Sequence, residues 1–104
     1  MTNIFENIPE EITEELFEDI ISNDKFRFER IVSKGQSTPE GEWLVQNKNE
    51  WVILIKGYAE LLFEGEEKKL SLKTGDYLFI GSRRKHKVVK TDPSGETIWL
   101  AVHF

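Results

Sequence analysis

The chain has 104 residues, and 38% of them are hydrophobic. Its aromatic residues are three Trp, two Tyr and seven Phe. This length and composition predict one soluble globular domain with one hydrophobic core. There is no cysteine, so disulfides and cysteine-based zinc sites are excluded. The net charge of −5 argues against nucleic acid as the main partner, because phosphate binding needs a basic surface.

The ends of the chain differ in charge. Residues 1–24 hold eight acidic side chains and neither Lys nor Arg, whereas basic side chains cluster over residues 83–90. Two interpretations stay open: two solvated faces of opposite sign, or an acidic segment that packs near the basic loop of its own or a neighbouring subunit. The first residues, MTNIFENIPEE, lack the basic start and apolar stretch of a signal peptide, and no apolar run is long enough to span a membrane. We therefore expect a cytoplasmic protein with no membrane partner.

The first element shows helical spacing. Pro9 suits a first helical position, and the acidic residues after it are favourable near a positive helix N-terminus. Apolar residues then recur at steps that form one stripe on a helix: Ile12, Leu16, Phe17, Ile20 and Ile21. We predict a short amphipathic helix over residues 10–21, inside an N-terminal helical segment of residues 1–24.

The rest of the chain, residues 25–104, is predicted to form strands. Short runs rich in β-branched and aromatic residues alternate with turns that contain Gly, Pro or Asp, at a spacing typical of an all-β sandwich or barrel. The predicted strands cover residues 25–32, 50–57, 58–65, 68–73, 76–80, 86–89 and 97–104.

Two stretches carry a specific spacing. Glu50 is followed by six residues, WVILIK, and then by Gly57, while Gly75 is followed by DYLFI and, further on, by His86. These spacings resemble the two motifs of the cupin superfamily, G-x5-H-x-H-x3,4-E-x6-G and G-x5-P-x-G-x2-H-x3-N. The resemblance spans residues 26–104 and implies a jelly-roll β-barrel.

The chain departs from the motifs at several positions. Cupin metal sites usually take three histidines and one glutamate; this chain keeps Glu50 and His86, while Leu44 and Gln46 stand at the other two histidine positions. Leucine cannot ligate a metal, and a glutamine carbonyl is a weak donor. Gly81, Arg83 and Lys90 stand where the second motif has its proline, second glycine and asparagine.

The resemblance places Glu50 and His86 side by side on inward-facing neighbouring strands, and three interpretations stay open. The two side chains pair with each other or Glu50 sits at a wet barrel mouth. Alternatively, His86, Glu50 and Gln46 hold a divalent metal (Zn, Ni, Fe or Mn), with waters in the other positions. In the third, no metal is bound and His86 acts as a base oriented by a carboxylate.

Further residues are candidates for the pocket. Strand alternation places Trp99 and His103 on one face of the last strand, so His103 is either a structural residue or the source of the missing imidazole. Trp43 and Trp51 serve packing, or Trp43 stacks on a flat ligand at the pocket mouth. Arg83 and Arg84 form a solvated turn, or attract an anionic ligand.

Two classes of function follow. The first is a small-molecule-binding cupin with a reduced, weak or absent metal site; the second is a metal-dependent cupin enzyme, a lyase, isomerase or dioxygenase acting on a small carboxylate or sugar-like substrate. The missing histidines favour the first class. A transcriptional regulator is disfavoured because no helix-turn-helix segment accompanies the barrel. We also expect a homodimer, because a small barrel leaves sheet edges to be covered and similar cupins often pair through their N-terminal segments.

Overall fold

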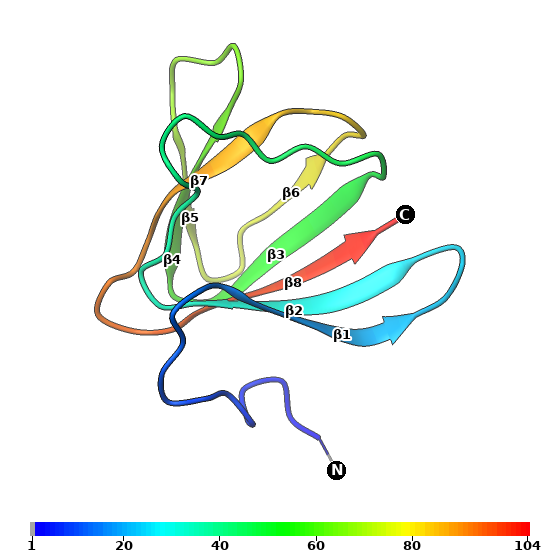
Figure 1. Ribbon diagram of the computed structural model, residues 1–104, viewed down its shortest axis with the longest axis vertical. Coiled ribbons are helices and arrows are strands. Elements are labelled where there is room, and N and C mark those ends of the chain that lie inside the picture. The colour runs from blue at the N-terminus through cyan, green and yellow to red at the C-terminus, as the bar shows by residue number, and fades with distance from the viewer. Residues whose placement is uncertain (1) are drawn as a thin grey trace.

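Eight β-strands form the fold in the computed structural model, which describes residues 2–104, and that range contains no helix (Figure 1). No helix among residues 2–104 is therefore long and apolar enough to cross a membrane. The strands are β1 (Leu16–Ser22), β2 (Arg27–Ser33), β3 (Glu50–Lys56), β4 (Tyr58–Phe63), β5 (Leu70–Lys73), β6 (Tyr77–Ile80), β7 (His86–Thr91) and β8 (Thr97–His103).

The strands form two antiparallel sheets. The larger sheet has the order β1-β2-β8-β3-β6, and the smaller has the order β5-β4-β7. The core lies between them and draws residues from both: Ile31, Val52, Leu54, Trp99 and Ala101 from the larger sheet, and Ala59, Leu61, Leu72 and Val88 from the smaller. The all-β prediction is confirmed, as two packed sheets.

The chain passes from one sheet to the other at Gly57, the glycine of the first motif. Gly57 has a φ of 92°, and a Cβ built there would lie 2.6 Å from Thr97 Oγ1 and 2.7 Å from the Glu96 carbonyl oxygen. Thr97 is fully buried and its hydroxyl donates to the Tyr58 carbonyl at 3.2 Å. The position therefore requires glycine for both its backbone angle and its space.

The predicted helix over residues 10–21 is wrong. Residues 16–22 form β1 instead, at the edge of the larger sheet, and a register shift between Asp19 and Ile21 interrupts its pairing with β2. The polar residues after the stripe form the turn of a hairpin, in which Asn23 Oδ1 accepts the Lys25 and Phe26 N–H groups at 2.8 and 3.0 Å. β2 offers a strand edge for backbone pairing along residues 16–22, and that tertiary pairing overrides the local helical pattern.

The residues before β1 are held by side chains of β2 and of the loop after it. Arg30, with a side chain only 6% exposed, donates to the carbonyls of Ile4, Glu6 and Asn7 at 2.9, 2.7 and 3.3 Å, and forms an ion pair with Glu18. Lys34 bonds the carbonyls of Pro9 and Glu10. These side-chain donors satisfy backbone carbonyls that no strand pairing uses, and so hold the residues before β1 against β2 as an N-terminal strap.

Candidate functional site

A cavity of about 500 Å³ lies between the two sheets, within the size range of small-molecule pockets. Apolar side chains from both sheets and from the loop before β3 form most of its wall: Phe17, Ile31, Leu44, Val45, Val52, Leu61, Ile80, Val88 and Trp99. The indole N–H of Trp99 is buried and has no hydrogen-bond partner among residues 2–104, which leaves an unmet donor in this wall.

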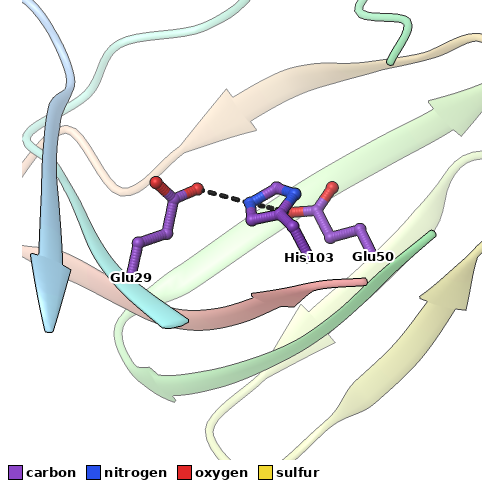
Figure 2. Close-up of side chains that lie close together, drawn as sticks. All are labelled: Glu29, Glu50 and His103. Carbon is purple, nitrogen blue, oxygen red and sulfur yellow. Dashed lines mark hydrogen bonds and ion pairs between the residues drawn. The ribbon is translucent and has the colours of Figure 1, made fainter. Parts of the chain in front are cut away.

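Glu29, Glu50 and His103 form a polar cluster on the larger sheet (Figure 2). Glu50 and His103 are Cα partners in the β3–β8 pair, and Arg27 is the partner of His103 in the β2–β8 pair. Glu29 lies two residues further along β2 than Arg27, so its side chain points to the same face. The three strands therefore bring the three side chains together, and Figure 2 shows the His103 ring between the two carboxylates.

The cluster is buried and closely spaced. Glu29, Glu50 and His103 are 4%, 7% and 4% exposed, and one ligand atom from each lies within 4.8 Å of the others. His103 Nε2 lies 2.6 Å from Glu29 Oε1 and 3.9 Å from Glu50 Oε2. The first distance is a hydrogen bond; the second is too long for one.

Two polar neighbours complete the cluster. Gln46, on the loop before β3, donates its Nε2 to Glu50 Oε1 at 2.8 Å. Arg27 Nε lies 3.6 Å from Glu29 Oε2 and 3.7 Å from Asp19 Oδ1, and the Arg27 side chain is 45% exposed. Arg27 is therefore shared between two carboxylates at the cavity mouth and neutralises the buried pair only in part.

His86 reaches the cavity from the smaller sheet, at the start of β7. Its Nδ1 lies 2.9 Å from the Arg84 carbonyl oxygen, and since a carbonyl oxygen only accepts, Nδ1 carries the proton. Within the described range, Nε2 of His86 has no protein partner. A neutral His86 therefore presents a lone pair as a hydrogen-bond acceptor.

Glu15 adds a fourth carboxyl group to the cavity wall, beside Glu29, Glu50 and Asp19. Burial raises the pKa of Glu15, and a hydrogen bond from the Ser33 hydroxyl at 2.6 Å opposes that rise. The shift means that the ionised form is disfavoured at this position.

The comparisons with known proteins place the chain in a family. Neither a family model nor a curated protein matches it significantly. Its structure matches that of a protein from Ralstonia eutropha JMP134, provisionally named a mannose-6-phosphate isomerase, with a TM-score of 0.95 and 33% identity over 99% of this chain and 95% of that one. A cupin superfamily protein from Desulfitobacterium hafniense DCB-2 matches at a TM-score of 0.74 and 15% identity, over 93% and 83% of the two chains. A cupin with a double-stranded β-helix fold from Methanocaldococcus jannaschii matches at 0.70 and 17%, over 92% and 84%. The chain belongs to the cupin superfamily.

The four cupin motif positions, Leu44, Gln46, Glu50 and His86, all line the cavity. Leu44 has no donor atom, the Gln46 amide is turned to Glu50 through its N–H, and His86 is absent from the cluster that contains Glu50. Glu50 and His86 also lie in different sheets, so the predicted neighbouring strands are wrong. The side-by-side placement failed because β8, with His103, and β6 occupy the two places beside β3, whereas β7 pairs with β4.

The other predicted pocket residues divide into two groups. His103 lies on the inner face, with Trp99 and Ala101, as the strand alternation predicts. The cavity wall among residues 2–104 does not include Trp43, Trp51, Arg83 or Arg84. Trp43 lies under Lys87 Nζ at 4.5 Å, Trp51 packs on Tyr77 at 5.4 Å, Arg83 bonds Asn47, and Arg84 pairs with Glu66.

Sequence reasoning missed Glu29. In RFERI, strand alternation places Arg27 and Glu29 on the same face as Ile31, which belongs to the core. The sequence did contain a signal for Glu29, because it places a carboxylate at a strand position that faces the core. A buried carboxylate needs a hydrogen-bond or charge partner, so such a position indicates a polar site.

Proposed function

We propose that this cupin binds a small molecule in the cavity between its sheets, with an apolar body and one polar group that reaches the Glu29–His103–Glu50 cluster. The observation that carries the proposal is a largely apolar cavity of about 500 Å³ with buried polar groups on its wall. Apolar surface gives affinity in such pockets, and a few fixed polar groups give orientation.

The charges on the wall favour a neutral or positively charged ligand group. Four carboxyl side chains and one guanidinium, that of Arg27, line the cavity within the described residues. Arg27 is already shared between Asp19 and Glu29. An anionic ligand, which the sequence led us to expect, would meet a like-charged wall in the metal-free protein.

His86 supplies a second polar contact from the opposite sheet. Its free Nε2 accepts a hydrogen bond, whereas the carboxylates of Glu29 and Glu50 accept from the other sheet. A ligand with two donor groups, such as an amine and a hydroxyl, satisfies both sides of the cavity.

A matched pair of probes tests this proposal. Benzylamine and benzoate are similar in size and opposite in charge, and both are to be titrated into chelator-treated, isotope-labelled protein by NMR. We expect benzylamine to shift the amide signals of cavity residues such as Leu61 and Val88 at lower concentration than benzoate. Tighter binding of benzoate, or the absence of shifts at the cavity from both probes, would overturn the proposal.

Isomerisation of a sugar phosphate is a second candidate. The relative from Ralstonia eutropha is provisionally named for this reaction, and a buried imidazole between two carboxylates can transfer a proton. The wall offers little to a phosphate, because the only guanidinium or ammonium among its described residues is that of Arg27. Conversion of mannose 6-phosphate to fructose 6-phosphate by the purified protein, lost in His103→Gln, would support the enzyme; no turnover at high protein concentration would exclude it.

A further inference from the structure

We infer that Glu29, Glu50 and His103 form a binding site for a divalent metal ion, displaced from the cupin motif positions to the strands β2, β3 and β8. Of the four motif positions, the site keeps only Glu50. The inference stands on the geometry of the cluster and does not depend on the organic ligand proposed above.

The first argument is charge. Glu29 and Glu50 are both more than nine-tenths buried, and one imidazole lies between them. Burying a carboxylate is costly unless a cation compensates it. Arg27 lies 3.6 Å from Glu29, but it is half exposed and shared with Asp19. Glu50 Oε1 accepts its hydrogen bond from the neutral Gln46 amide. A divalent cation supplies the missing charge at the point where the two carboxylates converge.

The second argument is spacing. Carboxylate oxygens and imidazole nitrogens bind zinc-like metals at about 2.0–2.2 Å, so two donors on one ion lie roughly 3 Å apart. His103 Nε2 lies 2.6 Å from Glu29 Oε1 and 3.9 Å from Glu50 Oε2. The two observed distances bracket the required one, and all three ligand atoms lie within 4.8 Å of one another. The metal then replaces the proton that Nε2 and Oε1 share.

The third argument is a free donor that faces the cavity. Gln46 engages Glu50 Oε1, while Oε2 has no hydrogen-bond partner among residues 2–104 although Glu50 is only 7% exposed. Glu29, Glu50 and His103 all line the cavity, so an ion has an entry path and keeps positions open for water or a ligand. Three protein ligands with open positions are typical of exchangeable, catalytic-type sites and not of closed structural ones.

A ligand set of two carboxylate oxygens and one imidazole nitrogen favours first-row divalent metal ions. We therefore choose Mn²⁺ and Zn²⁺ as the probes. A bound metal also reverses the charge preference of the cavity, because it offers an anionic oxygen a direct ligand. The metal therefore decides whether an acidic or a basic ligand is preferred.

The experiment is a calorimetric titration of tag-free, chelator-treated protein with Mn²⁺ and with Zn²⁺. Two matched pairs of variants locate the site: Glu29→Gln against Glu15→Gln, and His103→Gln against His86→Gln. Each pair compares a residue of the cluster with one of the same type that lines the cavity outside the cluster. We expect at least ~10-fold weaker binding for Glu29→Gln and His103→Gln, and a change within about two-fold for the other two.

Folding of each variant is checked by circular dichroism, and the melting temperature of the wild type should rise with metal concentration. If Glu29→Gln does not fold, Glu29→Asp is used instead. It keeps the negative charge but moves the carboxylate oxygen away from the metal position, and should still weaken metal binding by at least ~10-fold. The inference is overturned if the wild type binds neither ion below about 1 mM, or if His86→Gln abolishes binding while Glu29→Gln or Glu29→Asp leaves it intact. Metal binding without a response to either aromatic probe would leave this site standing and remove the proposed function instead.

Discussion

Glu50 on β3 and His103 on β8 are direct Cα partners across an antiparallel strand pair, so their side chains point to the same face of the larger sheet. Cupin motif spacing identifies Glu50 and gives no indication of this partner, because His103 lies outside both motifs. The strand register, and not the motif, decides which imidazole accompanies the glutamate.

Gly57→Ala should destabilise the protein by ~2–4 kcal/mol, because it adds left-handed backbone strain to a clash with Thr97 and Glu96. Gly75→Ala is the control: Gly75 has a similar φ of 94°, and a Cβ there meets nothing within 4 Å. Urea unfolding should give the larger loss at Gly57. Equal losses would show that the backbone angle alone matters.

Arg30→Met should cost ~2–4 kcal/mol of unfolding free energy, because three carbonyls and the Glu18 carboxylate lose their buried donor. It should also speed proteolysis of the residues before β1. Lys56→Met breaks the more exposed pair with Glu96 and should cost less than about 1 kcal/mol. A loss at Arg30 no larger than at Lys56 would contradict the anchoring role.

Glu15→Gln tests the raised pKa of the Glu15 carboxyl, which burial causes. A carboxyl with a raised pKa adds stability below its unfolded pKa and loses that contribution as the pH rises through its folded pKa. Gln keeps an acceptor for Ser33 and does not ionise. The stability of the variant relative to the wild type should therefore increase from about pH 4 to about pH 7, measured by urea unfolding. A difference that is constant or falls with pH would refute the assignment.

The homodimer expected from the sequence stays a prediction, and we propose the exposed aromatic residues of β6 as its contact surface. Arg30 holds the N-terminal strap on its own chain, whereas the outer face of β6 exposes Tyr77 and Phe79 by 66% and 56%, with Phe104 beside Phe79. Light scattering at micromolar concentration should give a dimer mass. Tyr77→Ser with Phe79→Ser should give a monomer, and Leu70→Ser, an exposed apolar residue of the smaller sheet, should not. A monomeric wild type would contradict the prediction.

Much of the fold follows from local sequence signals. The Gly75–Asp76 turn separates two predicted strands as expected, since Asp76 N donates to the Lys73 carbonyl and Asp76 Oδ2 accepts the Lys73 N–H. The helix over residues 10–21 failed because residues 16–22 pair with β2, which is a tertiary interaction. No local pattern contains that information.

The site was predictable only in part for the same reason. Glu50 follows from motif spacing, and the inward face of His103 follows from strand alternation. Glu29 joins them through the β2–β8 pairing, and the small, fully buried Ala101 opposite it leaves room for its side chain. His86 is buried and lines the cavity, yet its strand belongs to the other sheet.

A crystal structure of the protein soaked in Mn²⁺, with anomalous diffraction recorded to locate the metal, tests the displaced site most directly. We predict one strong peak bound by Glu29, Glu50 and His103. A peak at His86 and Gln46, or no peak in the cavity at millimolar Mn²⁺, would contradict the account.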